Sequence, residues 1–325
     1  MIRIGVIGAG AHSSAHHGPA LGRCREERPG AVELAAICDL DAERARKYAD
    51  RFGFEKVYTD METMLGEEDL DGVVAVTPLP LTEEIAGRVI QSGKPLVIEK
   101  PPGPTVEAAR RLRDRAVESG VPHMVSFNRR FNPALARARA WLAEEAAARR
   151  PCLAIARMLR HDRREEGFAF GTGIHLVDAV LSLMGRPEKV ESHASPVSPG
   201  GTLFFDARVR FADGGAACLA FAPACGRKGV EEESLEIIGE GYDVQVDIGR
   251  CRIGIWDQGE QVLEWRAAED AEDWEREGAL DEMRAFIRYL EAGEGWWPTL
   301  EDALWSARTA DAIQRGGETA LEERE

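Results

Sequence analysis

The stretch IRIGVIGAGAHSS, residues 2–14, decides the fold of the N-terminal part of the chain. Its apolar start predicts a short buried strand, and we expect a helix over Ser14–Leu21. Between them lies a G-x-G-x-x-S pattern. Gly8 permits a tight turn, Gly10 lets the backbone approach a pyrophosphate, and the small Ser13 lets the helix pack closely on the strand. Alone, the pattern is equally compatible with a glycine turn that binds no ligand.

A second apolar run, Val32–Cys38, ends at Asp39. An acidic residue at this place accepts hydrogen bonds from the ribose hydroxyls of a dinucleotide and repels a 2′-phosphate, which favours NAD over NADP. Asp39 follows Ser13 by 39 − 13 = 26 residues, against a usual offset of about 20. We interpret RCREERPG, residues 23–30, as a loop that adds this length. Asp39 could instead cap the helix predicted over 41–53, but Asp41 can serve as that cap.

Predicted strands and helices then alternate along the chain. The strands are Leu70–Val76, Pro95–Ile98 and Pro122–Phe127, and the helices are Glu83–Gln91 and Val106–Ser119. This order predicts a parallel sheet with helices on both faces. Ligands of such sheets bind beyond the carboxyl ends of the strands. TPLP at 77–80 and EKPPG at 99–103 lie at two such ends.

The second half of the chain has a different pattern. In LFFDARVRF, residues 203–211, apolar and charged residues alternate, which is typical of an antiparallel strand with one face in solvent. Further strands are predicted at Ala216–Phe221, Ser234–Ile238, Val244–Ile248, Cys251–Trp256 and Val262–Arg266.

Composition limits the classes of partner. The 325 residues carry a formal net charge of −16, which disfavours nucleic acid and anionic membrane surfaces. The length favours two domains. The six cysteines form no C-x-x-C pair, so we interpret them as reduced, mostly buried thiols of a cytoplasmic protein. The N-terminus does not resemble a signal peptide, no apolar run is long enough to span a membrane, and no metal site is predicted.

Several segments, taken in order, resemble the glucose–fructose oxidoreductase / inositol dehydrogenase / MocA family. They are GVIGAGAHSSAHHGPAL, CDLDAERA, VVAVTPLP, SGKPLVIEKPPGPT, RRFNPAL, GIHLVDAVLSLMG and PTLEDALWSARTADAI. The resemblance implies an α/β plus α+β fold: a doubly wound Rossmann domain over 1–122 and a domain over 123–325 built on a large, open, mostly antiparallel sheet. In the family the open face of that sheet commonly forms dimers or tetramers, so we expect a homo-oligomer.

The resemblance also implies an NAD-dependent dehydrogenase that acts on a secondary alcohol or ketone of a sugar, inositol or related polyol. Lys100 of the EKP motif would exchange the hydroxyl proton, which an amine can do when its pKa falls toward neutrality. A solvated lysine at a strand end is the alternative for an isolated EKP. The expected cofactor-binding residues are Gly8, Gly10, Ala11, His12, Asp39, Thr77, Pro78, Glu99 and Lys100. Relatives often carry Asn and His where this chain has Leu79 and Thr82.

The stretch FGTGIHLVD, residues 170–178, resembles the family's D-x-G-x-H-x-x-D segment, which presents an aspartate and a histidine to the substrate. His175 is therefore a second expected catalytic residue, unless it is a core histidine. The first aspartate of the pattern is replaced by Gly171. Another group could replace it, the nearest being Thr172, Asp162, Glu165 and Glu166. The substrate could also need no such group.

A third explanation for Gly171 is a non-catalytic, NAD-dependent sensor. Some relatives instead use bound NAD transiently to cleave a glycosidic bond. The expected substrate-binding residues are Arg129, Arg160, His161, Thr172 and His175. Arginine forks suit a carboxylate or phosphate on a substrate, although a run of arginines is more often a solvated face.

Overall fold

The computed structural model describes residues 1–163, 165, 167–196, 203–225, 232–293, 295 and 298–322. The chain forms two compact units, each described by itself below. Unit 1 comprises Met1–Asn128 and Gly278–Leu304, and unit 2 comprises Arg129–Glu277 and Trp305–Glu325. The expected division at residue 122 differs from this one. The strand His123–Ser126 pairs in parallel with Leu96–Glu99, and this pairing keeps it in unit 1.

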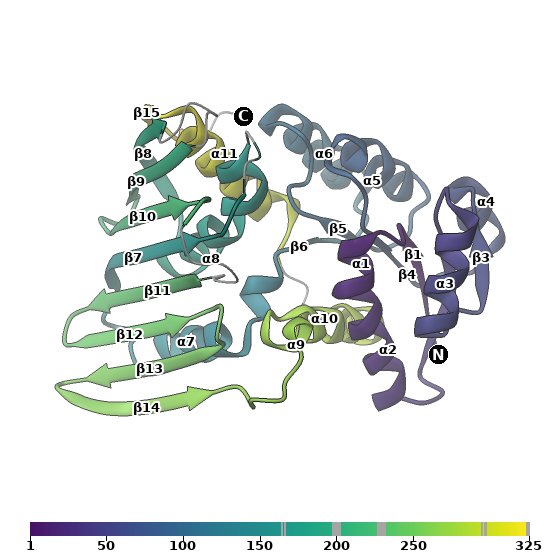
Figure 1. Ribbon diagram of the computed structural model, residues 1–325, viewed down its shortest axis with the longest axis horizontal. Coiled ribbons are helices and arrows are strands. Elements are labelled where there is room, and N and C mark those ends of the chain that lie inside the picture. The colour runs from purple at the N-terminus through teal and green to yellow at the C-terminus, as the bar shows by residue number, and fades with distance from the viewer. Residues whose placement is uncertain are drawn as a thin grey trace. The chain divides into compact units, whose positions relative to one another are not determined.

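Unit 1 is built on a parallel sheet in the order β3-β2-β1-β4-β5-β6 (Figure 1). Its strands are β1 (Ile2–Ile7), β2 (Val32–Cys38), β3 (Lys56–Tyr58), β4 (Gly72–Ala75), β5 (Leu96–Glu99) and β6 (His123–Ser126). Its helices are α1 (Ala11–Ala15), α2 (His17–Glu27), α3 (Ala42–Phe52), α4 (Met61–Glu67), the 3-10 helix η1 (Leu79–Leu81), α5 (Thr82–Gln91), α6 (Val106–Ser119) and α10 (Ala279–Ala292). The order reverses between β1 and β4, which is where doubly wound sheets bind ligands.

The segment after the glycine loop differs from the prediction. One helix was expected over Ser14–Leu21 and a loop over 23–30, but α1 ends at Ala15 and α2 runs on to Glu27. Leu21 and Cys24 are buried on α2, so apolar packing extends the helix through a segment whose charges suggested a loop. The large offset between Ser13 and Asp39 therefore comes from two consecutive helices.

Unit 2 is built on a nine-stranded sheet in the order β14-β13-β12-β11-β7-β10-β9-β8-β15. Every pairing is antiparallel except that of β10 with β7. The strands are β7 (Pro151–Leu159), β8 (Pro187–Pro196), β9 (Leu203–Phe211), β10 (Ala216–Ala222), β11 (Glu232–Gly239), β12 (Tyr242–Asp247), β13 (Arg252–Asp257), β14 (Glu260–Arg266) and β15 (Gly317–Ala320). This confirms the mostly antiparallel sheet that the sequence predicts.

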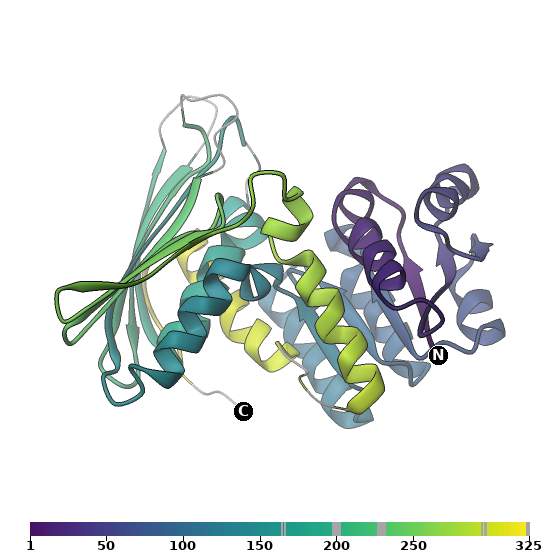
Figure 2. The same cartoon turned by 90° about the horizontal axis from the view of Figure 1, so that it is seen from below.

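Helices cover one face of this sheet, and the other face carries none in the described part of unit 2 (Figure 2). The unit's helical segments are η2 (Asn128–Phe131), α7 (Pro133–Glu144), the π-helix η3 (Ala169–Gly173), α8 (Ile174–Met184) and α9 (Asp273–Arg276), and α11 (Leu300–Arg315) begins in unit 1. Along β7, Ala154, Ala156 and Met158 are buried whereas Ile155 and Arg157 are exposed. This is the alternation of a strand with one solvated face.

The structure bears on two expectations drawn from composition, the burial of the cysteines and the membrane-spanning segments. None of the six cysteines, all of which lie in the described part of the chain, forms a disulfide. Only Cys24, Cys38 and Cys251 are buried, and Cys152 and Cys218 are exposed on strands of the nine-stranded sheet. The expectation of mostly buried thiols was therefore wrong for this sheet, because alternate residues of its strands face solvent. Among the described residues, no helix combines the length and the apolar character needed to cross a bilayer.

Candidate cofactor and active site

The glycine loop lies between β1 and α1. Gly8 has a φ of +101°, and a Cβ added there would lie 2.0 Å from the carbonyl oxygen of Val76, so the fold itself requires a glycine. A Cβ added at Gly10 would meet no other described residue within 4 Å. The open space at Gly10 is where a ligand's phosphates could approach the backbone. Ser13 is buried and its hydroxyl lies 2.8 Å from that of Tyr48, so serine serves the close packing of the third position.

Asp39 holds this loop from the end of β2. Its Oδ2 accepts from the backbone N–H of Ala9 at 2.8 Å, and its Oδ1 accepts from that of Asp41 at 2.9 Å. Arg44 also donates to both oxygens, from Nη2 at 2.5 Å and Nε at 3.1 Å. Burial alone would raise the pKa of Asp39, but these hydrogen bonds hold it below its usual value. The carboxylate is therefore ionised, and its side-chain partner Arg44 is half-exposed.

Asp41 caps α3, as the sequence predicts. Its side chain accepts from the backbone N–H groups of Glu43 and Arg44 at 3.0 and 3.1 Å. Ribose recognition by Asp39 and helix capping by Asp41 are thus compatible.

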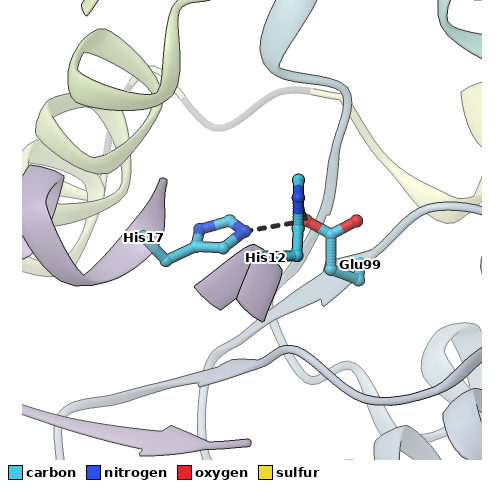
Figure 3. Close-up of side chains that lie close together, drawn as sticks. All are labelled: His12, His17 and Glu99. Atoms are coloured by element: carbon cyan, nitrogen blue, oxygen red, sulfur yellow. Dashed lines mark hydrogen bonds and ion pairs between the residues drawn. The ribbon is translucent and has the colours of Figure 1, made fainter. Parts of the chain in front are cut away.

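Glu99, the last residue of β5, is the centre of a second buried cluster (Figure 3). Its Oε1 lies 2.7 Å from Nε2 of His17 and 3.1 Å from Nε2 of His12. Its Oε2 accepts from the backbone N–H of Lys100 at 3.0 Å. His17 opens α2 and is 1 % exposed, whereas His12 of α1 is exposed. The carboxylate therefore joins the helices after the glycine loop to the strand end that carries Lys100.

The electrostatics of this cluster fix its protonation state. Burial would raise the pKa of Glu99, but hydrogen bonds from His12 and His17 bring it well below its usual value. Burial also lowers the pKa of His17, against the raising effect of Glu99. At neutral pH the carboxylate is therefore charged and His17 is neutral, with its proton on Nε2. Within the part of the chain that the structure describes, Nδ1 of His17 is buried without a hydrogen-bond partner.

The same three side chains could in principle hold a metal ion, because their ligand atoms all lie within 4.8 Å of one another. Metal-bound histidines usually donate their other ring N–H to an acceptor. A metal on Nε2 of His17 would move the proton to Nδ1, which is buried beside no acceptor among the described residues. The geometry is explained more simply by two imidazole N–H groups that donate to one carboxylate.

The other expected cofactor residues of unit 1 lie at the same carboxyl edge of the sheet. Lys100 directly follows β5 and is half-buried, and Thr77 and Pro78 follow the neighbouring β4 with their side chains at least partly exposed. Ala11 opens α1 and is exposed. The structure thus brings the glycine loop, Asp39, the TP pair and the EK pair to one edge.

His175 lies in unit 2, in the first turn of α8, and is 9 % exposed. Asp178, the last aspartate of the sequence pattern, is fully buried. Its two oxygens accept from Nε and Nη2 of Arg130, each at 2.7 Å, and Oδ1 also accepts from Ser306 at 2.8 Å. Asp178 therefore anchors the helix that carries His175.

Gly171 leaves room for the missing carboxylate, since a Cβ added there would meet no other described residue within 4 Å. Among the suggested replacements, Glu165 accepts a hydrogen bond from Thr172 at 3.1 Å. Arg163 in turn donates to Thr172 at 3.0 Å and pairs with Glu165 at 2.6 Å. Glu165 thus lies beside this turn, whereas Glu166 lies outside the described residues.

The expected substrate arginines have internal partners. Nη2 of Arg160 lies 2.7 Å from Oε2 of Glu233, and Arg129 donates to the same carboxylate at 3.4 Å and to Glu277 at 2.8 Å. Both arginines and Glu233 are buried. Burial alone would lower the pKa of Arg129, but the two glutamates raise it. His161 is exposed and its Nδ1 lies 3.0 Å from the Cys225 carbonyl oxygen. This arrangement favours a structural role for the two arginines.

Sequence reasoning missed two side chains at this edge. Arg44 pairs with the carboxylate of Asp39, and its place as the third residue of α3 gave no signal beyond the i, i+5 spacing to Asp39. His17 is one of three histidines within AHSSAHH. Only the break between α1 and α2, which turns His17 inward, distinguishes it from His16.

The parallel sheet and the glycine loop define a Rossmann-type nucleotide-binding domain in the first part of the chain, and comparison with known proteins agrees. Residues 2–127 match the family described as an oxidoreductase family with an NAD-binding Rossmann fold. This part of the chain is therefore similar to the glucose–fructose oxidoreductase / inositol dehydrogenase / MocA family.

Individual relatives match over part of their length. The levoglucosan dehydrogenase of Pseudarthrobacter phenanthrenivorans is 32 % identical over 152 residues, which are 46 % of this chain and 38 % of that protein. An inositol 2-dehydrogenase of Klebsiella pneumoniae is 32 % identical over 120 residues, 37 % of this chain and 34 % of that enzyme. The matched part thus spans little more than a third of these two relatives.

Solved structures agree with the fold over the whole chain. A levoglucosan dehydrogenase in complex with NADH has a TM-score of 0.86 at 20 % identity, and the match covers 99 % of this chain and 100 % of that one. An NAD-binding oxidoreductase from Klebsiella pneumoniae has a TM-score of 0.84 at 19 % identity, with 99 % of both chains covered. At this identity the likeness shows the fold alone.

Proposed function

We propose that the protein is an NAD-dependent oxidoreductase that transfers a hydride between the nicotinamide and a secondary alcohol or ketone of a sugar, inositol or related polyol. The observation that carries this proposal is the hydrogen bond from Ala9 of the glycine loop to Asp39 at the end of β2. It holds a ribose-binding carboxylate beside a loop suited to phosphates. The named activities of the matched relatives, on levoglucosan and inositol, support the substrate class.

The residues of unit 1 fit the cofactor. The open space at Gly10 accommodates phosphates, and Asp39 accepts hydrogen bonds from the ribose hydroxyls. Ala11, His12, Thr77 and Pro78 border the same edge. NAD, when bound, supplies the acceptor for the hydride that leaves the alcohol carbon.

Lys100 is the proposed acid and base. In oxidation its amine takes the proton from the substrate hydroxyl oxygen, and in reduction its ammonium returns a proton to the carbonyl oxygen. Its backbone N–H is held by Glu99, which fixes the start of the side chain. His175 is proposed to hydrogen-bond the substrate and to share its proton, with α8 anchored by the buried pair of Asp178 and Arg130.

Thr172 and His161 are the further proposed substrate contacts, because both side chains are at least partly exposed. Arg129 and Arg160 already bind Glu233, so we assign them to shaping unit 2. An unchanged substrate affinity in Arg160→Ala would support this assignment, whereas a large loss would return Arg160 to direct recognition of an anionic group.

We also propose a cytoplasmic homodimer or homotetramer that forms through the open face of the nine-stranded sheet. That face holds a hollow of about 1510 Å³ lined by residues of β7 and β11–β14. Ile155 and Val262 are 45 % and 52 % exposed. Light scattering of the purified protein would measure the oligomer, and a monomer at micromolar concentration would refute this part of the proposal.

The first test is a calorimetric titration of the ligand-stripped protein with NADH and then NADPH. Tight, NADH-selective binding supports the cofactor assignment and leads to a screen of polyols, with Lys100→Ala as the control for turnover. Tight binding without turnover would favour the sensor, for which Gly171 is the main support. Retained cofactor without net NADH formation would favour glycosidic cleavage. Absence of binding would refute the proposal.

A further inference from the structure

His17 is a buried titratable side chain to which the mechanism above gives no role. It lies at the start of α2, and its side chain is 2 % exposed. Its Nε2 donates to Oε1 of Glu99 at 2.7 Å, while Nδ1 is buried and meets no hydrogen-bond partner among the described residues. An unpartnered polar nitrogen in the interior destabilises the fold, so an apolar residue would serve packing alone at least as well.

The two carboxylate oxygens of Glu99 accept hydrogen bonds from different parts of unit 1. Oε1 faces the imidazoles of His17 and His12, which come from the two helices after the glycine loop (Figure 3). Oε2 faces the backbone N–H of Lys100. A charged acceptor makes these hydrogen bonds stronger than neutral ones. The position of the Lys100 backbone is thereby linked to that of α2 through one carboxylate.

His12 and His17 contribute unequally to this link. The side chain of His12 is 47 % exposed and its bond to Glu99 is the longer one, at 3.1 Å. It can exchange its bond for water and it borders the expected phosphate site. His17 is enclosed, and the other charged or titratable groups that act on it are Glu99, His12 and His16. His17 is therefore the constant partner of the carboxylate.

We propose that His17 is a positioning residue that holds Glu99, and through Glu99 the backbone of Lys100, in register with the cofactor loop. This inference rests on the proposed function, because the benefit of a fixed Lys100 is an aligned proton transfer. Small displacements of such a group cost large factors in rate. His17 touches neither substrate nor cofactor in this proposal.

The direct test measures the position of Lys100 without turnover. Hydrogen exchange of the Lys100 amide is followed in the wild type, in His17→Leu, which removes the N–H donor, and in His17→Gln, which retains one. We expect exchange to be about tenfold faster or more in His17→Leu and within about threefold of the wild type in His17→Gln. His193→Leu, at an exposed site of unit 2, is the matched control. Equal exchange in all four proteins would overturn the proposal.

The second measurement uses the polyol substrate identified by the screen. We expect His17→Leu to lower kcat about tenfold while KM for NADH stays within about threefold, and His17→Gln to restore most of kcat. Loss of the His17 donor should also move the acid limb of the kcat profile to higher pH, because Glu99 is then held less firmly in its charged form. An equal loss of kcat in His17→Leu and His17→Gln would indicate that His17 only fills space in the core, and would overturn the proposal.

The imidazole nitrogens of wild-type His17 provide a test that needs no variant. Nitrogen-15 NMR at neutral pH should show a neutral ring with the proton on Nε2. A ring whose only proton is on Nδ1 would overturn the proposal even if His17→Leu failed to fold, because Nε2 would then have no proton to donate to Glu99. Absence of turnover in the wild type would instead refute the proposed function, and the exchange and NMR results would still decide whether His17 positions Lys100.

Discussion

Two carboxylates end two strands of the same sheet, and their partners differ. Asp39 at the end of β2 is paired with Arg44, whose side chain is 50 % exposed, and its other partners are backbone N–H groups. Glu99 at the end of β5 is paired with the enclosed His17. An exposed arginine can leave its partner at little cost. A buried imidazole cannot, because its N–H would lose its only acceptor.

The exposure of the partner distinguishes a carboxylate that can bind a ligand from one that stabilises the fold. A carboxylate with an exchangeable partner is ready to receive a ligand, whereas a carboxylate with a buried partner holds the scaffold together. Asp39 fits the first use and Glu99 the second, although the sequence presents both as an acid directly after an apolar strand. The predictions below test this separation.

The largest effect on stability is expected when Glu99 is replaced by leucine. The buried N–H of His17 and the part-buried N–H of Lys100 would lose their acceptor, which should lower the free energy of unfolding by about 2–3 kcal/mol. Asp39→Leu should cost less, about 1–2 kcal/mol, because the buried N–H of Ala9 loses its acceptor while Arg44 and the N–H of Asp41 regain water. Urea denaturation followed by circular dichroism measures both. Equal losses would show that the two carboxylates are not distinct in this sense.

The largest effect on cofactor choice is expected at Asp39. Asp39→Ala should weaken NADH binding about 10- to 100-fold, since hydrogen bonds to a charged group are lost. The same change releases Arg44, whose guanidinium can then pair with a 2′-phosphate. NADPH should therefore bind more tightly to Asp39→Ala than to the wild type, and this gain should disappear in the double variant Asp39→Ala/Arg44→Ala. Calorimetry measures all four combinations, and an unchanged NADH preference would refute the role of Asp39.

The comparison also shows what the sequence could predict. Five of the six parallel strands follow from apolar runs and their spacing, and the structure places these five within a few residues of the predicted bounds. The sixth, β3, was not predicted, because its three residues are too short a run to give a strand signal. Asp39 could be found because it directly follows the second apolar strand, although its offset from the glycines is longer than usual. Arg44 could not, because its contact with Asp39 depends on the side-chain conformation of an exposed residue.

The break between α1 and α2 was also beyond sequence reasoning. His16, His17 and Gly18 give no strong helix-breaking signal of the kind that proline gives, and the inward turn of His17 depends on Glu99, which lies 82 residues away. Likewise, Arg129 and Arg160 resemble substrate ligands until Glu233 is seen between them. Tertiary partners, rather than local patterns, decide which charged residues of this chain are available to a ligand.

A smaller effect is expected in the pH dependence of stability. The pKa of His17 is lowered in the folded protein. Below about pH 6.5 the imidazole is therefore protonated in the unfolded chain while it stays neutral in the folded protein. Stability from this group is therefore complete at higher pH and is lost as the pH falls below that value. His17→Gln lacks the group, and its unfolding free energy should fall about 1 kcal/mol less between about pH 7.5 and pH 5.5.

The exposed His193 provides the control for this measurement. His193→Gln makes the same substitution at an exposed position, so its pH dependence is measured beside that of His17→Gln. If His17→Gln followed the wild-type dependence of unfolding free energy on pH, folding would not lower the pKa of His17, and the folded protein would take up the proton below about pH 6.5 as the unfolded chain does. Glu99 does not disturb this comparison between about pH 7.5 and pH 5.5. Its pKa is lowered in the folded protein, so its contribution to the free energy of unfolding is lost only below about pH 4.5.

The smallest effect is expected from Arg44→Ala. The Arg44 side chain that pairs with Asp39 is half-exposed. Loss of this ion pair should therefore change the free energy of unfolding by less than about 1 kcal/mol. NADH binding should stay equal or tighten slightly, because the ribose no longer competes with a guanidinium for the carboxylate. A tenfold loss of NADH affinity would instead mean that Arg44 binds the cofactor itself. Asp39 would then be one half of a ligand-binding pair, and the contrast with Glu99 would lie in burial alone.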